Sequence, residues 1–564
     1  MDKYQVARML DEISRYIQLG ETNPFKSRAF ERAARSIEKL DRDVGELVSS
    51  GELLATPGIG KGIGPVITEI VSSGSSSYLE ELREQYPPGI FDLLRIPNLG
   101  LKKIGILYEQ LGVTSIDELE KAAQDNLVAG LPGFGKKTQQ KILEGVGFAR
   151  KRQSQFLLPA GLEAGELVRE QLAAIDEVED AEVAGSVRRR LEVIRNVNVV
   201  IATRAPEKVI AQLPRFAADL ETIDDETVKG TVRGDMPVLF HFAAPNDFGR
   251  ALLRATGSGE FVGAFEAKAA KTLKARNEEQ LFEKAGIPFV EPERREDADE
   301  LRRKKRPSLV HPSDLRGTFH VHTTYSDGRN TVAQMLTAAR DRGFDYCGIS
   351  DHSVAAYYAG GLTTLRVKQQ QAEIAREAKE VAPMRVFRGT EADILPDGTM
   401  DYGDDLDMFD FVIASIHSRF QMTEEEMTER ILHALDDPRV TILGHLTGRR
   451  LLTRNGYKVD YDRIFEKAAA NGVLVEINGN PQRLDVDWRH LGRAAEMGVV
   501  FTINPDAHSI REMSHVISGT WVARKAGLTA KNIFNTRPAD EVEDWLKRRR
   551  KRWTSTKGNW AFEG

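Results

Sequence analysis

The second half of the chain contains seven short apolar runs, and segments with helical periodicity separate them. Their sequences are GTFHVH, YCGISDH, MRVFRGTE, DFVIASIH, RVTILGHL, GVLVEING and VVFTINPDAH. Strands that alternate with helices in this regular way are typical of parallel βαβ units, and so many in succession favour a barrel. We therefore predict a distorted (β/α)7 barrel over residues 317–564.

Metal-binding residue types stand at or just beyond the carboxyl ends of these predicted strands. In a βα barrel those ends converge on one face, where active sites are built. Six of the 11 histidines of the chain lie there. The complete set is His320, His322, Asp327, His352, Glu391, His417, His445, Asp506 and His508.

This concentration of imidazole and carboxylate groups predicts a metal centre. Packed into one barrel mouth, the nine groups would repel and desolvate one another unless cations held them. His, Asp and Glu without cysteine suit Zn, Mn or Fe, and the set exceeds what one ion needs. A carboxylate-bridged cluster polarises a phosphoryl oxygen and supplies hydroxide near neutral pH, which favours phosphoester hydrolysis. Any single histidine would more often be an ordinary core or loop residue, so the prediction depends on the whole set.

The same residues carry a family resemblance. The segments HVHTTYSDG, SDH, GTE, SIHSR, GHLTGR and PDAH resemble the motif series of PHP (polymerase and histidinol phosphatase) domains. The resemblance implies up to three divalent ions, Mn or Zn, and gives the ligands of the first ion the catalytic role. The implied ligands are His320, His322, Glu391 and Asp506 for the first ion, Glu391, His417 and His445 for the second, and Asp327, His352 and His508 for the third.

Three related segments, TPGIGKGIG, IPNLGLKKIG and LPGFGKKTQQKI, lie in an otherwise helical region over residues 1–150. They resemble helix-hairpin-helix motifs, although Asn98 replaces the first glycine of the middle copy. Glycines in such a turn let backbone N–H groups point at a phosphate, whatever the base sequence. One copy alone would more often be a helix cap and turn. The DNA-binding residues that the resemblance implies are Gly58, Gly60, Lys61, Gly100, Gly133, Gly135 and Lys136.

From about Val178 the periodicity shifts towards two, which predicts a small mixed α/β domain. The segments NPFKSRAFERAARSI, AGSVRRRLEVI and FGRALLRATGSGE resemble bacterial family X DNA polymerases, and with the barrel the resemblance covers almost the whole chain. It implies a nucleotidyltransferase-like palm whose nucleotide-binding segment holds Gly185, Ser186, Arg188 and Arg189; on the residues alone, the arginines are equally a solvated charge cluster. The implied domains are an N-terminal helical domain (1–84), fingers (85–150), palm (151–225), palm end and thumb (226–300), linker (301–316) and PHP domain (317–564).

The palm segment departs from the family in its metal ligands. Nucleotidyl transfer uses carboxylates that hold two Mg²⁺ ions. Counting from Gly185–Ser186, the first two carboxylate positions hold Asn196 and Asn198. Counting back from the FGR segment puts Leu239 at the third, while the alternative, Asp235, falls in RGDM, which predicts a hairpin turn. We expect a degenerate polymerase site without Mg²⁺.

Composition is neutral about function. The net charge is −6, and 41% hydrophobic with 29% charged residues is ordinary for a globular protein of several domains. The sequence contains no apolar run long enough to span a membrane. The single cysteine, Cys347, fits a reducing compartment. We expect a cytoplasmic protein, without a membrane partner and monomeric.

Three functions stay open. The first is a DNA-repair protein that binds gapped, nicked or recessed 3′ ends of DNA and removes 3′ nucleotides with the PHP domain, as a metal-dependent 3′-5′ exonuclease. The second is an active Mn-dependent gap-filling polymerase that uses Asp235, Glu192 or another carboxylate. The third is a small-molecule phosphoesterase attached to a scaffold. The intact barrel motifs and the altered palm favour the first.

Overall fold

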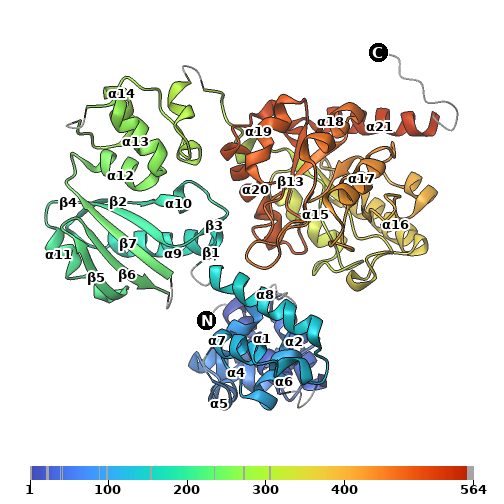
Figure 1. Cartoon of the computed structure of the whole chain (residues 1–564). Helices are drawn as coiled ribbons and strands as arrows, with labels where there is room; N and C mark the ends of the chain where they lie inside the picture. Colours follow the sequence, from blue (N-terminus) through green and yellow to red (C-terminus); the bar gives the residue numbers. More distant parts are fainter. Residues whose placement is uncertain are drawn as a thin grey trace. The chain divides into compact units, whose positions relative to one another are not determined.

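The computed structural model describes residues 3–555 except 21–23, 39, 41, 88, 97–98, 153–154, 234–235, 271–272 and 304–305. The chain divides into two compact units, Met1–Ser154 and Gln155–Gly564 (Figure 1). The finer domain boundaries expected from the sequence stay predictions. None of the helices in the described residues is long and apolar enough to cross a membrane.

The first unit is all α-helical, as predicted (Figure 1). One hydrophobic core contains Leu10 and Ile67, and a second contains Leu107 and Val146. Side chains cap several helices; the Ser115 hydroxyl, for example, accepts the N–H of Glu118. The helices are α1 (Lys3–Leu19), α2 (Pro24–Glu38), α3 (Val44–Ser49), α4 (Gly64–Ser73), α5 (Ser77–Gln85), α6 (Leu101–Leu111), α7 (Ile116–Gln124) and α8 (Lys136–Arg152).

The second unit begins with a mixed five-stranded sheet in the order β2-β4-β7-β6-β5, in which only β4 and β7 pair in parallel. Alternate residues of β4 face opposite sides, so Val199 packs towards α9 while Val200 packs towards α12. The elements are β1 (Phe156–Leu157), α9 (Leu158–Ala173), β2 (Val178–Ala184), α10 (Gly185–Arg188), β3 (Val193–Ile194), β4 (Val197–Thr203), α11 (Pro206–Ile210), β5 (Ala218–Asp224), β6 (Thr227–Val232), β7 (Met236–Ala243) and α12 (Phe248–Thr256).

A helical region with α13 (Gly259–Lys268) and α14 (Glu278–Lys284) follows the sheet. Its core includes Phe261 and Phe282. The Glu278 carboxylate is buried between two guanidinium groups, because Arg295 and Arg188 both pair with it. Arg188, from the segment expected to bind a nucleotide, is thus held by α14.

The rest of the unit is a nearly closed parallel barrel, as the alternation of apolar runs and helices predicts. Its strands follow the order β14-β13-β12-β11-β10-β9-β8. The first and last strands meet through a bridge between Val321 and Ala507. The strands are β8 (Gly317–Thr318), β9 (Tyr346–Ile349), β10 (Arg385–Asp393), β11 (Phe411–Ser415), β12 (Ile442–Leu443), β13 (Leu474–Asn478) and β14 (Phe501–Asn504).

Helices cover the barrel, and an aromatic cluster fills its amino-terminal end. The Phe319 and Phe411 rings meet edge to face at 5.2 Å. A Cβ on Gly389 would lie 2.2 Å from the Phe411 ring, so only glycine leaves it room there. The helices are α15 (Val332–Asp341), α16 (Thr364–Glu380), α17 (Glu424–Leu435), α18 (Tyr461–Asn471), α19 (Trp488–Glu496), α20 (His515–Lys525) and α21 (Ala539–Ser555).

Helix α20 joins the barrel to the preceding sheet and helices. The Lys525 ammonium is buried, pairs with Glu296 and donates to the Arg189 carbonyl at 3.1 Å. The Arg190 guanidinium lies 4.5 Å above the Trp521 ring. These contacts explain why residues 155–564 form one compact unit.

Candidate functional site

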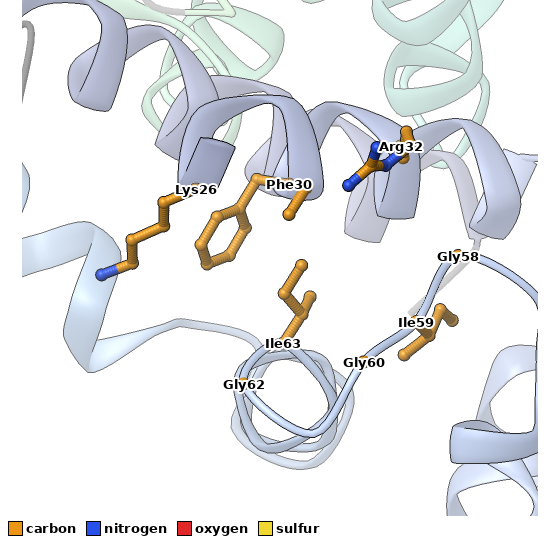
Figure 2. A pocket seen from close by; sticks show the side chains of 9 residues that line it. Lys26, Phe30, Arg32, Gly58, Ile59, Gly60, Gly62 and Ile63 are labelled. Atoms are coloured by element: carbon orange, nitrogen blue, oxygen red, sulfur yellow. The ribbon is translucent and has the colours of Figure 1, made fainter. Parts of the chain in front are cut away.

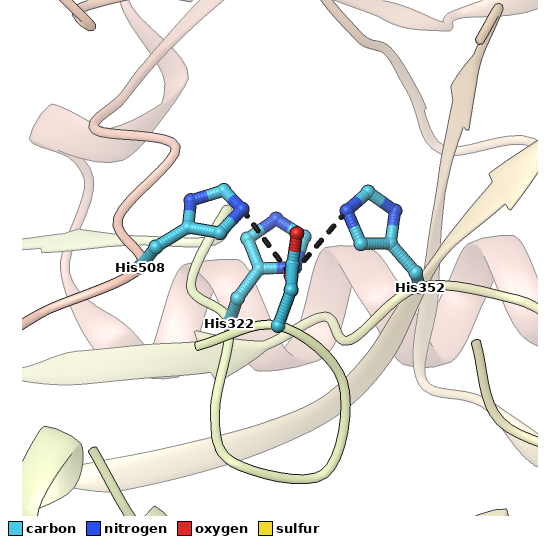
Figure 3. A group of neighbouring side chains, drawn as sticks. His322, His352 and His508 are labelled. Carbon is cyan, nitrogen blue, oxygen red and sulfur yellow. Dashed lines mark ion pairs between the residues drawn. The ribbon is translucent and has the colours of Figure 1, made fainter. Parts of the chain in front are cut away.

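The nine side chains expected to hold metal come together at the carboxyl ends of the barrel strands. Figure 3 shows His322, His352 and His508 turned towards one another, although they come from three different loops. The His322 and His508 rings are 4.2 Å apart, and the His322 and His352 rings 4.5 Å. Asp327 lies among them, with its Oδ1 3.3 Å from His508 Nε2 and 3.7 Å from His352 Nε2.

Glu391 occupies the middle of the site. It lies in β10, is 1% exposed, and its carboxylate oxygens are within 3.5 Å of nitrogens from five imidazoles. Those five are His320 (3.3 Å), His322 (3.5 Å), His352 (2.9 Å), His417 (3.3 Å) and His445 (2.9 Å). A carboxylate with so many ligand-type neighbours has the position of a bridge between cations.

Three groups of ligand atoms in this mouth are close enough to hold an ion. They are His322, Asp327, His352 and His508; His320, His322 and Glu391; and His352, Glu391 and His417. The expected third ion matches the first group with His322 added. Asp506 Oδ1 lies 3.5 Å from His322 Nε2, and His445 lies beside Glu391, so both border the groups without being members. The assignment of each ligand to an ion stays a prediction.

The chemistry of these atoms fits divalent cations. Nε2 of His320, Nε2 of His322 and Nδ1 of His352 are buried and have no hydrogen-bond partner among the described residues. A buried nitrogen without a partner is costly, and a bound cation would remove that cost. Such a site combines imidazole and carboxylate in the way that Mn and Zn prefer.

Two further carboxylates orient the histidines. Oε1 of Glu476, in β13, lies 2.7 Å from Nδ1 of His320, and Oδ1 of Asp393, in β10, lies 2.6 Å from Nδ1 of His417. Each contact leaves Nε2 of the ring facing Glu391. A carboxylate behind a ligating imidazole fixes its tautomer and raises its basicity.

The sequence analysis missed both orienting residues. Their signal is a polar side chain inside an apolar strand: Glu476 in GVLVEING, and Asp393 two residues after Glu391, on the same face of β10. Asp351, which precedes His352, is buried and accepts the N–H and the hydroxyl of Thr323, so it shapes the loop that carries Asp327.

Burial and charge divide the imidazoles of the metal-free site. Burial lowers the pKa of His417, but the carboxylates of Glu391 and Asp393 outweigh it and raise that pKa to about 9. His508 reaches about 9 for the same reason, beside Asp327 and Asp506. Burial and the neighbouring His508 and His352 lower the pKa of His322 to about 3. Protons therefore hold positions that cations would take.

Comparisons with known proteins agree with this arrangement. A PHP domain family profile matches residues 318–480, a helix-hairpin-helix domain profile residues 1–76, and a SAM-like helix-hairpin-helix tandem profile residues 90–147. The chain is 35% identical over 571 residues to the DNA polymerase/3′-5′ exonuclease PolX of Bacillus subtilis, a match that covers 97% of the chain and 100% of the relative. The chain belongs to the PolX family.

Shorter parts of this PolX-family chain are similar to smaller proteins. A probable phosphatase of Thermoanaerobacter sp. is 25% identical over 254 residues, which is 41% of the chain and 95% of the relative. A probable phosphatase of Clostridium acetobutylicum is 29% identical over 171 residues, 28% of the chain and 63% of the relative. The family and the PHP fold expected from the sequence are confirmed.

In the palm of this PolX-family chain, the two asparagines contact each other. Asn198 Nδ2 donates to Asn196 Oδ1 at 2.9 Å, and Asn198 Oδ1 lies 2.9 Å from His241 Nε2. Leu239 is the register partner of Asn198 on β7, which is the place expected for the third carboxylate. Asp235 lies outside the described residues.

The nucleotide-binding segment of the palm is tied to its surroundings. Gly185 (φ 65°) starts α10, and a Cβ on it would lie 2.5 Å from the Asn198 amide. Ser186 follows in the same short helix. Arg188 pairs with Glu278, and Arg189 pairs with Glu296 at 3.0 Å, so both arginines have carboxylate partners.

The helix-hairpin-helix turns of the PolX-family chain have the expected backbone. Gly58 and Gly133 adopt φ of 90° and 77°, Gly100 precedes α6, and Gly135 precedes α8, which starts at Lys136. Gly60 and the exposed Lys61 lie in the first turn. A cavity of about 540 Å³ opens there, where Figure 2 shows Lys26 and Arg32 above the turn. Asn98 of the middle copy lies outside the described residues.

Proposed function

We propose that the chain is a DNA-repair 3′-5′ exonuclease in which the PHP barrel hydrolyses the phosphodiester and the polymerase half holds the DNA. Its substrates are gapped, nicked or recessed 3′ ends, and it works as a monomer in the cytoplasm, where bacterial DNA is. The proposal goes beyond the family name in two respects: it assigns cleavage to the barrel, and it takes polymerase activity away from the palm.

The contrast between the two centres carries the proposal. In the barrel, Glu391 has five imidazoles around it. In the palm, Asn196, Asn198 and Leu239 stand where three carboxylates are expected. An amide lacks the negative charge that offsets two divalent cations, and leucine has no ligand atom, so the affinity of the palm for Mg²⁺ should be lost.

Up to three Mn²⁺ or Zn²⁺ ions fit the barrel ligands, and they would act as Lewis acids on a phosphoryl oxygen and supply hydroxide near neutral pH. The chain itself orients and protects this chemistry. Glu476 and Asp393 hold the rings of His320 and His417, and burial keeps bulk water from the carboxylates. Arg483 Nε, 3.1 Å from Asp506 Oδ2, places a positive charge at the edge of the centre, where a phosphoryl group develops negative charge.

The helix-hairpin-helix turns support the DNA-holding role. Backbone N–H groups and the amino-terminal ends of α6 and α8 suit phosphate contacts that ignore the base sequence. The exposed Lys61 and Lys136 add charge beside two of the turns.

The proposal is tested with 3′-end chemistry. Gapped and recessed DNA, labelled so that each removed 3′ nucleotide is visible on a gel, is incubated with the full chain and Mn²⁺. We expect a ladder of shortened products, and none with the double variant His320→Ala, His322→Ala. The matched control is His433→Ala, which removes an exposed histidine of α17 and should shorten DNA normally. Intact DNA with the unaltered chain, or shortening that survives the double variant, contradicts the proposal.

The second candidate is a residual gap-filling polymerase. It is motivated by the name of the B. subtilis relative, which includes polymerase activity. Primer extension with Mn²⁺ by the His320→Ala, His322→Ala variant would separate it from the exonuclease. Loss of extension in Asp235→Ala or Glu192→Ala would identify the substitute carboxylate.

The third candidate, a phosphoesterase for small molecules, is motivated by the similarity to probable phosphatases. Competition tells it apart from the exonuclease. DNA that enters the barrel should inhibit hydrolysis of a chromogenic phosphate ester, whereas a small-molecule enzyme should be indifferent to DNA.

A further inference from the structure

Two tyrosines stand exposed at the barrel mouth. Tyr357 is 85% exposed and Tyr358 61%, in a short turn of the loop between β9 and α16. Their rings are 6.0 Å apart at 79°. The Tyr358 ring is 6.4 Å from the ring of His417, one of the five imidazoles around Glu391. Burial and the nearby carboxylates of Asp393 and Glu391 raise the pKa of Tyr358, which agrees with this position.

The loop that carries the tyrosines is anchored to the metal centre. Ser353 N–H donates to the Glu391 carbonyl at 2.9 Å, and Leu362 N–H to the His352 carbonyl at 2.8 Å. Between them, Ala355 N–H donates to the Asp401 carboxylate at 2.7 Å. The exposed rings are therefore presented from a fixed backbone, and presenting them has a purpose other than packing.

Three arginines from two other loops reach the same mouth. Arg483, beyond β13, pairs with Asp506 at 3.1 Å. Arg450 and Arg454, beyond β12, donate to neutral oxygens of Gln482 (2.5 Å) and Gly448 (2.7 Å). Burial and the nearby Arg483 lower the pKa of both Arg450 and Arg454, which shows three like charges held together. Within the described part of the chain, one carboxylate therefore faces three guanidinium groups.

An arginine cluster and an exposed aromatic pair recognise different parts of a nucleotide. Guanidinium groups bind phosphate oxygens through paired donors. Tyrosine rings stack on unpaired bases of any identity. A duplex end offers no such base, because its last base is paired and stacked.

We propose that Tyr357, Tyr358, Arg450, Arg454 and Arg483, named here the tyrosine–arginine rim, bind the 3′-terminal nucleotide of single-stranded DNA. The unpaired base stacks on the tyrosines, and the phosphate lies between the arginines and the metal centre. This inference rests on the proposed exonuclease and adds its specificity. The barrel selects unpaired 3′ ends over paired ones, and nucleotides over phosphate esters that lack a base.

The first experiment measures binding alone. Isothermal titration of the full chain in EDTA, where no ester is hydrolysed, compares thymidine 5′-monophosphate with 2-deoxyribose 5-phosphate, which differ by the base. We expect the nucleotide to bind about tenfold more tightly, as one stacked base implies. The double variant Tyr357→Ala, Tyr358→Ala should lose this difference. The matched control, Tyr357→Phe, Tyr358→Phe, keeps the rings and should keep it. Arg450→Gln, Arg454→Gln should weaken both ligands equally.

The second experiment measures preference. Shortening of a single-stranded oligonucleotide and of a blunt duplex is compared for the unaltered chain and the tyrosine variants. We expect kcat/KM to favour the single strand by about tenfold or more, and the alanine variant to lose that preference while the phenylalanine variant keeps it. Circular dichroism and thermal melting check that each variant is folded.

The outcomes separate the two proposals. If the unaltered chain shortens no DNA, the exonuclease proposal has failed, whatever the titration gives. If DNA is shortened but the two ligands bind alike, or the alanine variant keeps its preference, only the tyrosine–arginine rim is wrong. The exposed tyrosines would then be left to contact another protein.

Discussion

Oε1 of Glu476 lies 2.7 Å from Nδ1 of His320, and both side chains are completely buried. The other carboxylate oxygen, Oε2, accepts the His445 N–H at 2.8 Å. One residue thus fixes two histidines of the metal centre without facing the substrate, and it acts as a positioning residue.

Glu476→Gln should weaken metal binding by about 10- to 100-fold, because the His320 ring loses the charge that raises its basicity. The measurement is the dissociation constant for Mn²⁺ or Zn²⁺ in a competition titration, which needs no activity assay. Glu466→Gln, on the exposed side of α18, is the control and should bind metal normally. Unchanged affinity in Glu476→Gln would show that the residue serves packing alone.

The metal-free protein should become less stable as the pH rises from about 6.5 to about 9. His417 and His508 have folded pKa values of about 9, above the value of about 6.5 in an unfolded chain. Their protons therefore stabilise the fold fully below pH 6.5, and this contribution is lost as the pH passes 9. Thermal melting in EDTA across this range is the measurement, and a melting temperature that rises would contradict the assignment.

Metal binding should show the opposite trend. Cations must displace the protons of His417 and His508, so affinity for Mn²⁺ should rise over the same interval and protons should be released. Calorimetry in two buffers with different ionisation enthalpies measures that release. Proton release that is the same at pH 7 and pH 10 would show that these imidazoles are already neutral.

Glu278→Ala should destabilise the protein by about 3–5 kcal/mol, because the buried Arg295 guanidinium would be left without its partner. Chemical denaturation followed by circular dichroism measures the loss. The exposed pair Arg204–Glu179 supplies the control, and Glu179→Ala should change stability by less than about 1 kcal/mol. Replacing Glu278 and Arg295 together with leucine and methionine should recover much of the loss, and equal damage in both variants would contradict the prediction.

Restoring the three palm carboxylates should restore a metal site. The triple variant Asn196→Asp, Asn198→Asp, Leu239→Asp places carboxylates at register-paired positions of β4 and β7. We expect it to bind at least one more Mn²⁺ than the unaltered chain, and to extend a primer where the unaltered chain does not. The Leu239→Asn version, with the same two aspartates, is the control for charge. Extension by the unaltered chain at a similar rate would show that the palm was never disabled.

The barrel could be predicted from the sequence because two independent signals coincide in it. The apolar runs alternate with helices, and each ligand type falls at a strand end, as for Glu391 at the end of its run. The ladders are shorter than the apolar runs: β8 and β12 have two residues each. The last part of each run instead forms the mouth, where side chains replace ladder bonds.

The orienting and rim residues could not be predicted from one sequence. His320 and Glu476 are 156 residues apart, and no local pattern announces their contact. Arg188 gave the same ambiguity, since a nucleotide-binding and a structural arginine look alike until Glu278 is seen beside it. Pairing over such distances is decided by tertiary packing, which local periodicity does not encode.

Because one glutamate lies against five rings, the cations that it would bridge cannot be independent of one another. Removing one ion changes the charge on Glu391, and with it the environment of every remaining imidazole. Loading and unloading of this centre should then be collective, so that a protein stripped of part of its metal behaves as a mixture of full and empty molecules.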